Sequence, residues 1–203
     1  MSKEPCNRRY ASGVCALVAI LAICGVALGA GRPEKLVLTV TDLPTGFHQT
    51  RSAVYSNASA RGETGKLSPG RVTGWRAEYA RNDRISGLLS VSSQVDVYST
   101  AGAANAFLNV ENDIRNLRRF AKLAGSVTVS IRRQSVDRLG SESRLFLVHA
   151  AQGQYAVDVY VLSWRFAETD AYVAGLGIAG TFQSSQIVAL AKKQQARIRR
   201  AAG

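Results

Sequence analysis

The run from Leu145 to Ile178 reads LFLVHAAQGQYAVDVYVLSWRFAETDAYVAGLGI, three apolar stretches separated by two polar turns. In its middle stretch, β-branched and aromatic residues occupy every second position from Tyr155 to Val161, the spacing that lines one face of a strand. Gln152-Gly153 and Glu168-Thr169-Asp170 have the composition of tight turns. The run therefore predicts three consecutive strands, which short turns pair in antiparallel fashion.

A helix is expected after these strands, with Ser184 or Ser185 as its N-cap. Its apolar residues recur at helical spacing and would share one side. They are Ile187, Leu190, Ala191 and Ile198.

The same plan occurs earlier in the chain. Strands are expected over 75–79 and 89–97, with a turn at Asn82-Asp83 between them. A helix then starts at Ser99 or Thr100 and ends at Gly125, and a further strand is expected over 127–131. The sequence thus predicts an α+β fold, an antiparallel sheet with two helices on one face, in two strand-turn-strand-helix halves. An old duplication and convergence on a common plan both explain the repetition.

Two segments before these halves lack this plan. Leu36, Leu38 and Val40 alternate with their neighbours and predict a strand that stops at Asp42-Leu43-Pro44. The run from Ser56 to Gly70, SNASARGETGKLSPG, predicts an exposed loop.

The N-terminal region contains an uncharged run over residues 11–30, ASGVCALVAILAICGVALGA, preceded by Arg8-Arg9. Its length suits a membrane-spanning helix, and the two arginines predict a cytoplasmic N-terminus with the rest exported. Three outcomes stay open: cleavage as a signal peptide near Gly29 or Ala30, retention as an anchor, or lipid attachment at Cys24. We divide the chain into a signal peptide or anchor (1–30), a short linker (31–35) and an exported α+β domain (36–203).

The composition restricts the environment and the partners. The chain has a formal charge of +12, and most of this excess lies in residues 31–203. Such a charge favours anionic partners. The three cysteines all lie within the first thirty residues, so the domain must fold without disulfides.

Short motifs suggest a relationship to known proteins. Asp42-Leu43-Pro44-Thr45-Gly46-Phe47 resembles a segment of many uncharacterised exported bacterial proteins. Leu139-Gly140-Ser141-Glu142-Ser143, with Ser163-Trp164-Arg165 and Tyr172-Val173-Ala174, is similar to a pattern of exported sensor-like α+β domains. Such domains occur on some bacterial serine/threonine kinases. The Gly-Asn pair of that pattern is replaced here by Glu168-Thr169. The resemblance implies the fold and no catalytic residue.

Catalytic and cofactor motifs are weak. The domain has two histidines, His48 and His149, and no cysteine, which argues against a conventional zinc site; His149 is expected to be a sheet residue. Gly175, Gly177 and Gly180 match G-x-G-x-x-G but lie in a strand pattern with no strand after the following helix, so no dinucleotide site is expected. We expect no catalytic residue, metal or cofactor.

The remaining signal is basic. Arg115, Arg118, Arg119 and Lys122 form one stripe at helical spacing, and several cations of the last helix face away from its apolar side. These last are Lys192, Lys193, Arg197, Arg199 and Arg200. Both sets are solvated faces or contacts with an anionic membrane surface or an acidic wall polymer. Export and the lack of interleaved aromatic residues argue against nucleic acid.

The favoured function is a non-enzymatic, exported envelope module of a bacterium that binds or senses an unidentified ligand. The alternative is an exported small-molecule carrier or hydrolase whose site is assembled from scattered residues. A deep apolar pocket would favour the alternative, whereas a filled core with a flat basic face would favour the binding module.

Overall fold

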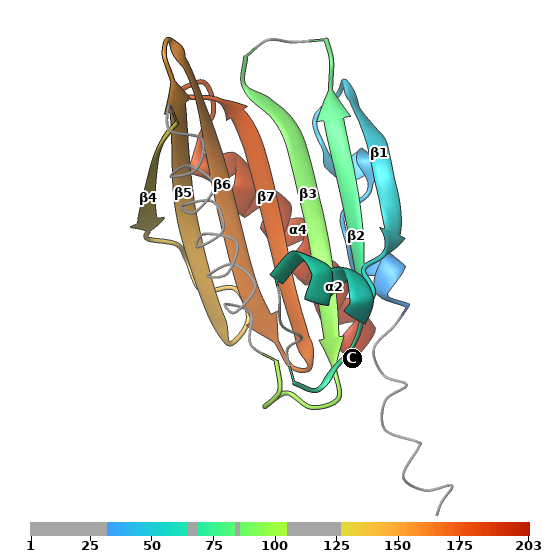
Figure 1. Cartoon of the computed structure of the whole chain (residues 1–203). Coiled ribbons are helices and arrows are strands. Elements are labelled where there is room, and N and C mark those ends of the chain that lie inside the picture. The colour runs from blue at the N-terminus through green and yellow to red at the C-terminus, as the bar shows by residue number, and fades with distance from the viewer. Residues whose placement is uncertain (1–31, 65–68, 84–85, 105–126) are drawn as a thin grey trace, which may run out of the picture.

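The computed structural model describes residues 32–64, 69–83, 86–104 and 127–203. They form a seven-stranded antiparallel sheet in the order β1-β2-β3-β7-β6-β5-β4, with helices added to it (Figure 1). The predicted α+β class and antiparallel sheet are confirmed. The strands are β1 Phe47–Val54, β2 Arg71–Arg81, β3 Leu88–Tyr98, β4 Thr128–Gln134, β5 Glu142–Gln152, β6 Tyr155–Phe166 and β7 Thr169–Ile178. The helices are α2 Asn57–Thr64 and α4 Ser184–Ala202, with two 3-10 helices, η1 Pro33–Lys35 and η2 Val40–Asp42.

The run from Leu145 to Ile178 forms most of β5 and all of β6 and β7, as predicted. Gly153, in the first turn, has a φ of 59°, a conformation that glycine adopts without strain. At the second turn Ala167 has a φ of 50°, so the chain reverses one residue earlier than expected. The last strands of the two predicted halves, β3 and β7, pair with each other at the centre of the sheet.

Helix α4 covers one face of the sheet and contacts β6 and β7 (Figure 1). Its predicted apolar side is confirmed, since Ile187, Leu190, Ala191 and Ile198 are all buried. A Cβ added at Gly175 would lie 2.3 Å from Ile187 Cδ1, so the glycines of β7 allow the helix to approach the strand. The predicted cap is wrong: Gln183 is the N-cap, and its N–H donates to Gln186 Oε1 at 3.1 Å.

The strand predicted over 36–40 is wrong. Leu36, Val37 and Leu38 are 2%, 2% and 1% exposed, so three consecutive side chains are buried where a strand would turn alternate ones outward. Their backbone is bonded by side chains instead: Leu38 N–H donates to Ser93 Oγ at 3.0 Å, and Tyr79 Oη donates to the Leu38 carbonyl. Of the expected linker, residues 33–35 form η1, which contacts β2 and β3.

Three further features bear on the sequence predictions. Strand β1 was not predicted, because its residues from His48 to Ser52 are all exposed and show no apolar alternation. The loop expected over 56–70 contains α2. The first of the two predicted covering helices, over 100–125, falls largely outside the described residues, and so does the apolar run 11–30. Among the helices that the structure describes, none is both long and apolar enough to cross a membrane.

Candidate functional site

The sheet face opposite α4 contains two rows of polar side chains. Residues paired across antiparallel strands point to the same face, so the register defines each row. The charged row runs across β3, β7, β6 and β5 and comprises Asp96, Asp170, Arg165 and Glu142. The neutral-centred row lies beside it, with arginines at its two ends and neutral side chains between them: Arg76, Gln94, Tyr172, Ser163 and Arg144.

At β2 the charged row ends in a buried ion pair between Arg71 and Asp96. Arg71 Nε and Nη2 lie 3.0 Å and 2.6 Å from Asp96 Oδ1, and both side chains are almost fully buried. The same guanidinium donates to Asn57 Oδ1 and to the Tyr55 carbonyl, both at 2.5 Å, which joins α2 to the sheet. A Cβ at Gly74 would lie 2.3 Å from both Arg71 Nη2 and Asp96 Oδ1, so glycine there makes room for the pair.

Burial dominates the electrostatics of Asp96. Removal from water raises the pKa of its carboxyl, because the charged form loses hydration. The Arg71 guanidinium and the Gln94 amide, whose Nε2 donates to Oδ2 at 3.0 Å, favour the charged form and oppose this rise. Asp96 therefore depends on Arg71 to remain ionised.

The other end of the charged row reaches solvent at β5. Glu142 accepts from Arg144 Nη2 at 3.1 Å and lies 4.0 Å from Arg165 Nη2. Arg165 also donates to the Ala104 carbonyl at 2.8 Å, which joins β6 to the loop after β3. These three side chains are 27–41% exposed, so this end of the row is open to a ligand.

The neutral-centred row is partly buried, with the half-buried Tyr172 between Gln94 and Ser163. Arg76 Nε donates to Gln94 Oε1 at 2.7 Å, and the Arg76 guanidinium stacks on the Tyr55 ring at 4.1 Å. Gln94 and Ser163 are about fully buried. The Ser163 hydroxyl has no hydrogen-bond partner in the described part of the chain. Buried polar groups reduce stability unless they are bonded. Gln94 and Asp96, unlike Ser163, are bonded to neighbouring side chains.

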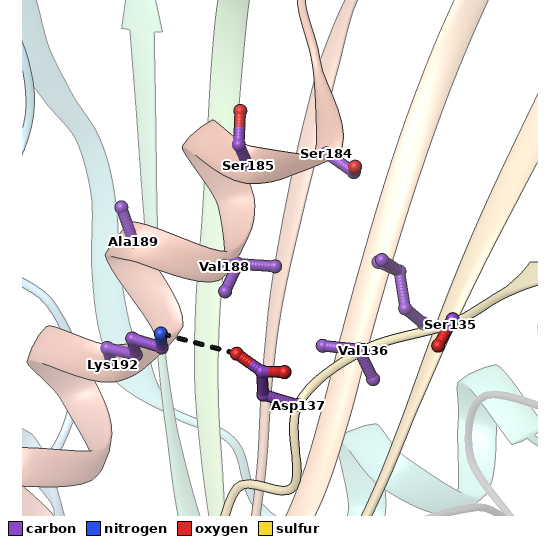
Figure 2. A pocket seen from close by; sticks show the side chains of 9 residues that line it. Ser135, Val136, Asp137, Ser184, Ser185, Val188, Ala189 and Lys192 are labelled. Carbon is purple, nitrogen blue, oxygen red and sulfur yellow. Dashed lines mark ion pairs between the residues drawn. The ribbon is translucent and has the colours of Figure 1, made fainter.

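A groove lies on the α4 face, at the edge of the sheet. The loop from Ser135 to Asp137 and the first turns of α4 border a volume of about 430 Å³ (Figure 2). Figure 2 shows Val136 and Val188 pointing toward each other across the groove, with Lys192 and Asp137 3.8 Å apart at its end. A neighbouring hollow of about 360 Å³ continues past Arg133 and Ser143. Both are open to solvent rather than enclosed.

His149 lies in β5, as predicted. Its Nδ1 lies 2.8 Å from Asp158 Oδ1 on β6, and Asp158 Oδ2 accepts from the Gly180 N–H at 2.9 Å. The pair therefore joins the β5–β6 hairpin to the turn that precedes α4. In the described residues, no three His, Cys, Asp or Glu side chains come together as a metal site would require.

The predicted basic residues have different positions. The stripe of Arg115, Arg118, Arg119 and Lys122 lies outside the described residues. On α4, Lys193 and Arg197 are bonded to the N-terminal segment rather than free in solvent: Lys193 donates to the Asp42 carbonyl, and Arg197 pairs with Asp42 at 2.7 Å. Arg199 and Arg200 are exposed.

Comparison with known proteins identifies a similarity in structure. No protein-family model matches the chain, and no curated protein matches it in sequence. The structure is similar to the crystal structure of the extracellular domain of PknH from Mycobacterium tuberculosis. The TM-score is 0.56 at 10% identity, over 84% of this chain and 96% of that one. The resemblance to extracellular sensor-like domains, predicted from short motifs, is thereby confirmed at the level of the fold.

The two polar rows could not be identified from the sequence. Gln94 and Asp96 do alternate with Val95 and Val97 in β3, which indicates a strand with one polar face. The pairing of β3 with β7 brings Asp96 opposite Asp170, and no local pattern encodes this pairing.

Proposed function

We propose that the chain is a non-enzymatic, exported binding or sensing module of a bacterial envelope. The observation that carries this proposal is the similarity of its fold to a domain that lies outside a bacterial cell. The uncharged run 11–30 behind Arg8-Arg9 supports the same direction of transfer, since basic residues favour the cytoplasmic side.

The described site supports binding rather than small-molecule carriage or hydrolysis. A carrier or hydrolase encloses its ligand in a deep, mostly apolar pocket. Here the described core is filled by side chains such as Trp164, Leu162 and Val173, and the two hollows at the sheet edge are open. At β5 the two polar rows end at Glu142, Arg144 and Arg165, which offer accessible groups of both signs to a polar ligand.

The direction of export is tested with reporters fused after Gly203 of the full chain. We expect an alkaline phosphatase fusion, active only outside the cytoplasm, to be active, and a green fluorescent protein fusion to be dark. Arg8→Glu with Arg9→Glu should reduce phosphatase activity, because it removes the positive charge that holds the N-terminus inside. Arg132→Glu with Arg133→Glu is the matched control and should retain activity. Fluorescence of the unmutated fusion in the cytoplasm would overturn the proposal.

A further inference from the structure

Helix α4 and the N-terminal segment lie side by side and run in opposite directions. Lys193 Nζ donates to the Asp42 carbonyl at 2.5 Å, and one turn later Arg197 Nη1 donates to the Val37 carbonyl at 3.1 Å. Arg197 Nη2 also donates to Thr39 Oγ1 at 3.2 Å. Residues before Val37 therefore lie beside the last turn of α4. Figure 1 shows the C-terminus close to the point where the described chain begins.

This arrangement gathers exposed cations at one end of the domain. Arg32 and Lys35 come from the start of the described chain, and Arg199 and Arg200 from the last turn of α4; all four are exposed. Glu34 is the acidic residue between the first two and is half-buried. We call Arg32, Lys35, Arg199 and Arg200 the proximal cations.

The apolar run ends only a few residues before the proximal cations, so a membrane that holds the run would lie close to them. The run ends at Ala30, and the described structure already begins its first helical turn at Pro33. Two intervening residues span at most roughly 7 Å. A chain that leaves a bilayer at residue 30 therefore keeps the proximal cations within reach of the lipid headgroups.

We infer that the proximal cations bind the anionic headgroups of the membrane in which residues 11–30 are inserted. This inference rests on the proposed export and adds retention of the apolar run as an anchor. Each lysine or arginine near an anionic leaflet contributes about 1 kcal/mol of attraction, which salt weakens. The contact would orient the domain with the groove, which lies at the first turns of α4, directed away from the bilayer. The charged row lies nearer to the bilayer, because the Arg199 guanidinium lies 5.8 Å over the Phe166 ring, next to Arg165.

Hydrogen exchange on the full chain in lipid nanodiscs tests this inference. One disc contains phosphatidylcholine alone, and the other contains equal parts of phosphatidylcholine and phosphatidylglycerol. We expect the amides of residues 196–202 to exchange about fivefold more slowly in the anionic disc, the equivalent of one such charge contact. The difference should disappear at about 0.5 M salt, where the Debye length is only a few ångströms.

Two variants identify the residues responsible. Replacing all four proximal cations with glutamine (Arg32→Gln, Lys35→Gln, Arg199→Gln and Arg200→Gln) should abolish the difference between the discs. Arg132→Gln with Arg133→Gln, an exposed pair on β4 at the far edge of the sheet, should retain it. Equal exchange in the two discs, or a difference that survives the first variant, would overturn the inference.

A third arm separates lipid from other polyanions. Soluble polyglutamate added to phosphatidylcholine discs should not reproduce the protection, and equal protection by it would overturn the assignment to lipid. The exchange measurement is independent of the cell, so it can fail while the export reporters succeed. A cytoplasmic reporter with intact lipid protection would instead overturn only the proposed function.

Discussion

The two faces of the sheet carry different kinds of side chain. On the α4 face, β2, β3, β6 and β7 present mostly apolar side chains, and α4 with the N-terminal segment covers them. On the other face, the same strands present Arg76, Gln94, Asp96, Asp170 and Ser163, all of them polar and four of them buried. The strands alternate between these two sets residue by residue, so a single sheet carries both.

The two faces are expected to contribute differently to the stability of the fold and to its specific geometry. Apolar burial stabilises a fold in proportion to area and tolerates many side chains. A buried ion pair such as Arg71–Asp96 is weak evidence for stability, because desolvation offsets most of the attraction. We therefore expect the α4 face to provide most of the folding free energy, and the polar rows to be retained for the geometry that they impose.

The largest expected effect is that of Arg71→Met. It leaves the Asp96 carboxylate buried without its guanidinium and should reduce the free energy of unfolding by about 3–5 kcal/mol in urea titrations at neutral pH. Burial raises the pKa of Asp96, so protonation removes this cost, and the deficit should shrink as the pH falls toward about 4. Arg51→Met, on an exposed stretch of β1, should change stability by about 0.5 kcal/mol or less. A deficit that is independent of pH would show that Asp96 is not the cause.

On the apolar face, Ile187→Ala should cost about 2–5 kcal/mol, because the side chain is fully buried against Gly175 and a cavity remains. The loss should be independent of pH and salt, in contrast to that of Arg71→Met. Val72→Ala removes a valine that is 52% exposed and serves as the control, with a change of about 0.5 kcal/mol or less. If both variants were equally mild, α4 would not anchor the fold.

The contrast between the faces also explains what the sequence could predict. The sequence of β6 shows the alternation of a strand from Tyr155 to Val161, and that of α4 shows helical spacing of apolar residues from Ile187 to Ile198. Both patterns are visible because each element buries one side. Leu36 to Leu38 bury every side chain because the segment lies against β2 and β3 beside α4, and their apolar spacing imitates that of a strand. In β1 nearly every side chain is exposed, so its sequence shows no hydrophobic periodicity.

The functional features depend on contacts between distant residues. Arg71 and Asp96 are 25 residues apart, and Arg197 lies 160 residues from Val37, whose carbonyl it binds. For the α4 cations the sequence predicts a solvated face or a contact with an anionic surface, because helical spacing shows which side is polar, not what packs beside it. The order of strands in the sheet, which creates the polar rows, has no local signal.

Tyr79 gives a smaller, pH-dependent effect at the junction with the N-terminal segment. Burial, with a contribution from Asp42, raises its pKa to about 12, above the ordinary value of 10. Because this pKa is raised, the contribution of Tyr79 to the free energy of unfolding is fully present below pH 10 and is lost as the pH rises to about 12. The loss is at most about 2–3 kcal/mol. Stability measured across this range should fall more steeply for the unmutated chain than for Tyr79→Phe. If stability fell equally with pH in the unmutated chain and in Tyr79→Phe, the raised pKa of Tyr79 would be contradicted.

The smallest expected effect is at the groove. Lys192 and Asp137 are 56% and 86% exposed and 3.8 Å apart, so Lys192→Gln should change stability by about 0.5 kcal/mol or less. Thermal unfolding at low and high salt would measure it. A larger loss would mean that this pair, rather than Val136 and Val188, holds the loop against α4.

The most direct test of the contrast is to replace the buried ion pair by apolar residues. Unfolding free energies are measured for Arg71→Met, for Asp96→Leu and for the two substitutions together. We predict that the double variant folds and recovers to within about 1–2 kcal/mol of the unmutated chain, because no unpaired charge remains buried. A double variant that loses the sum of the two single losses would show that the polar face stabilises the fold as strongly as the α4 face.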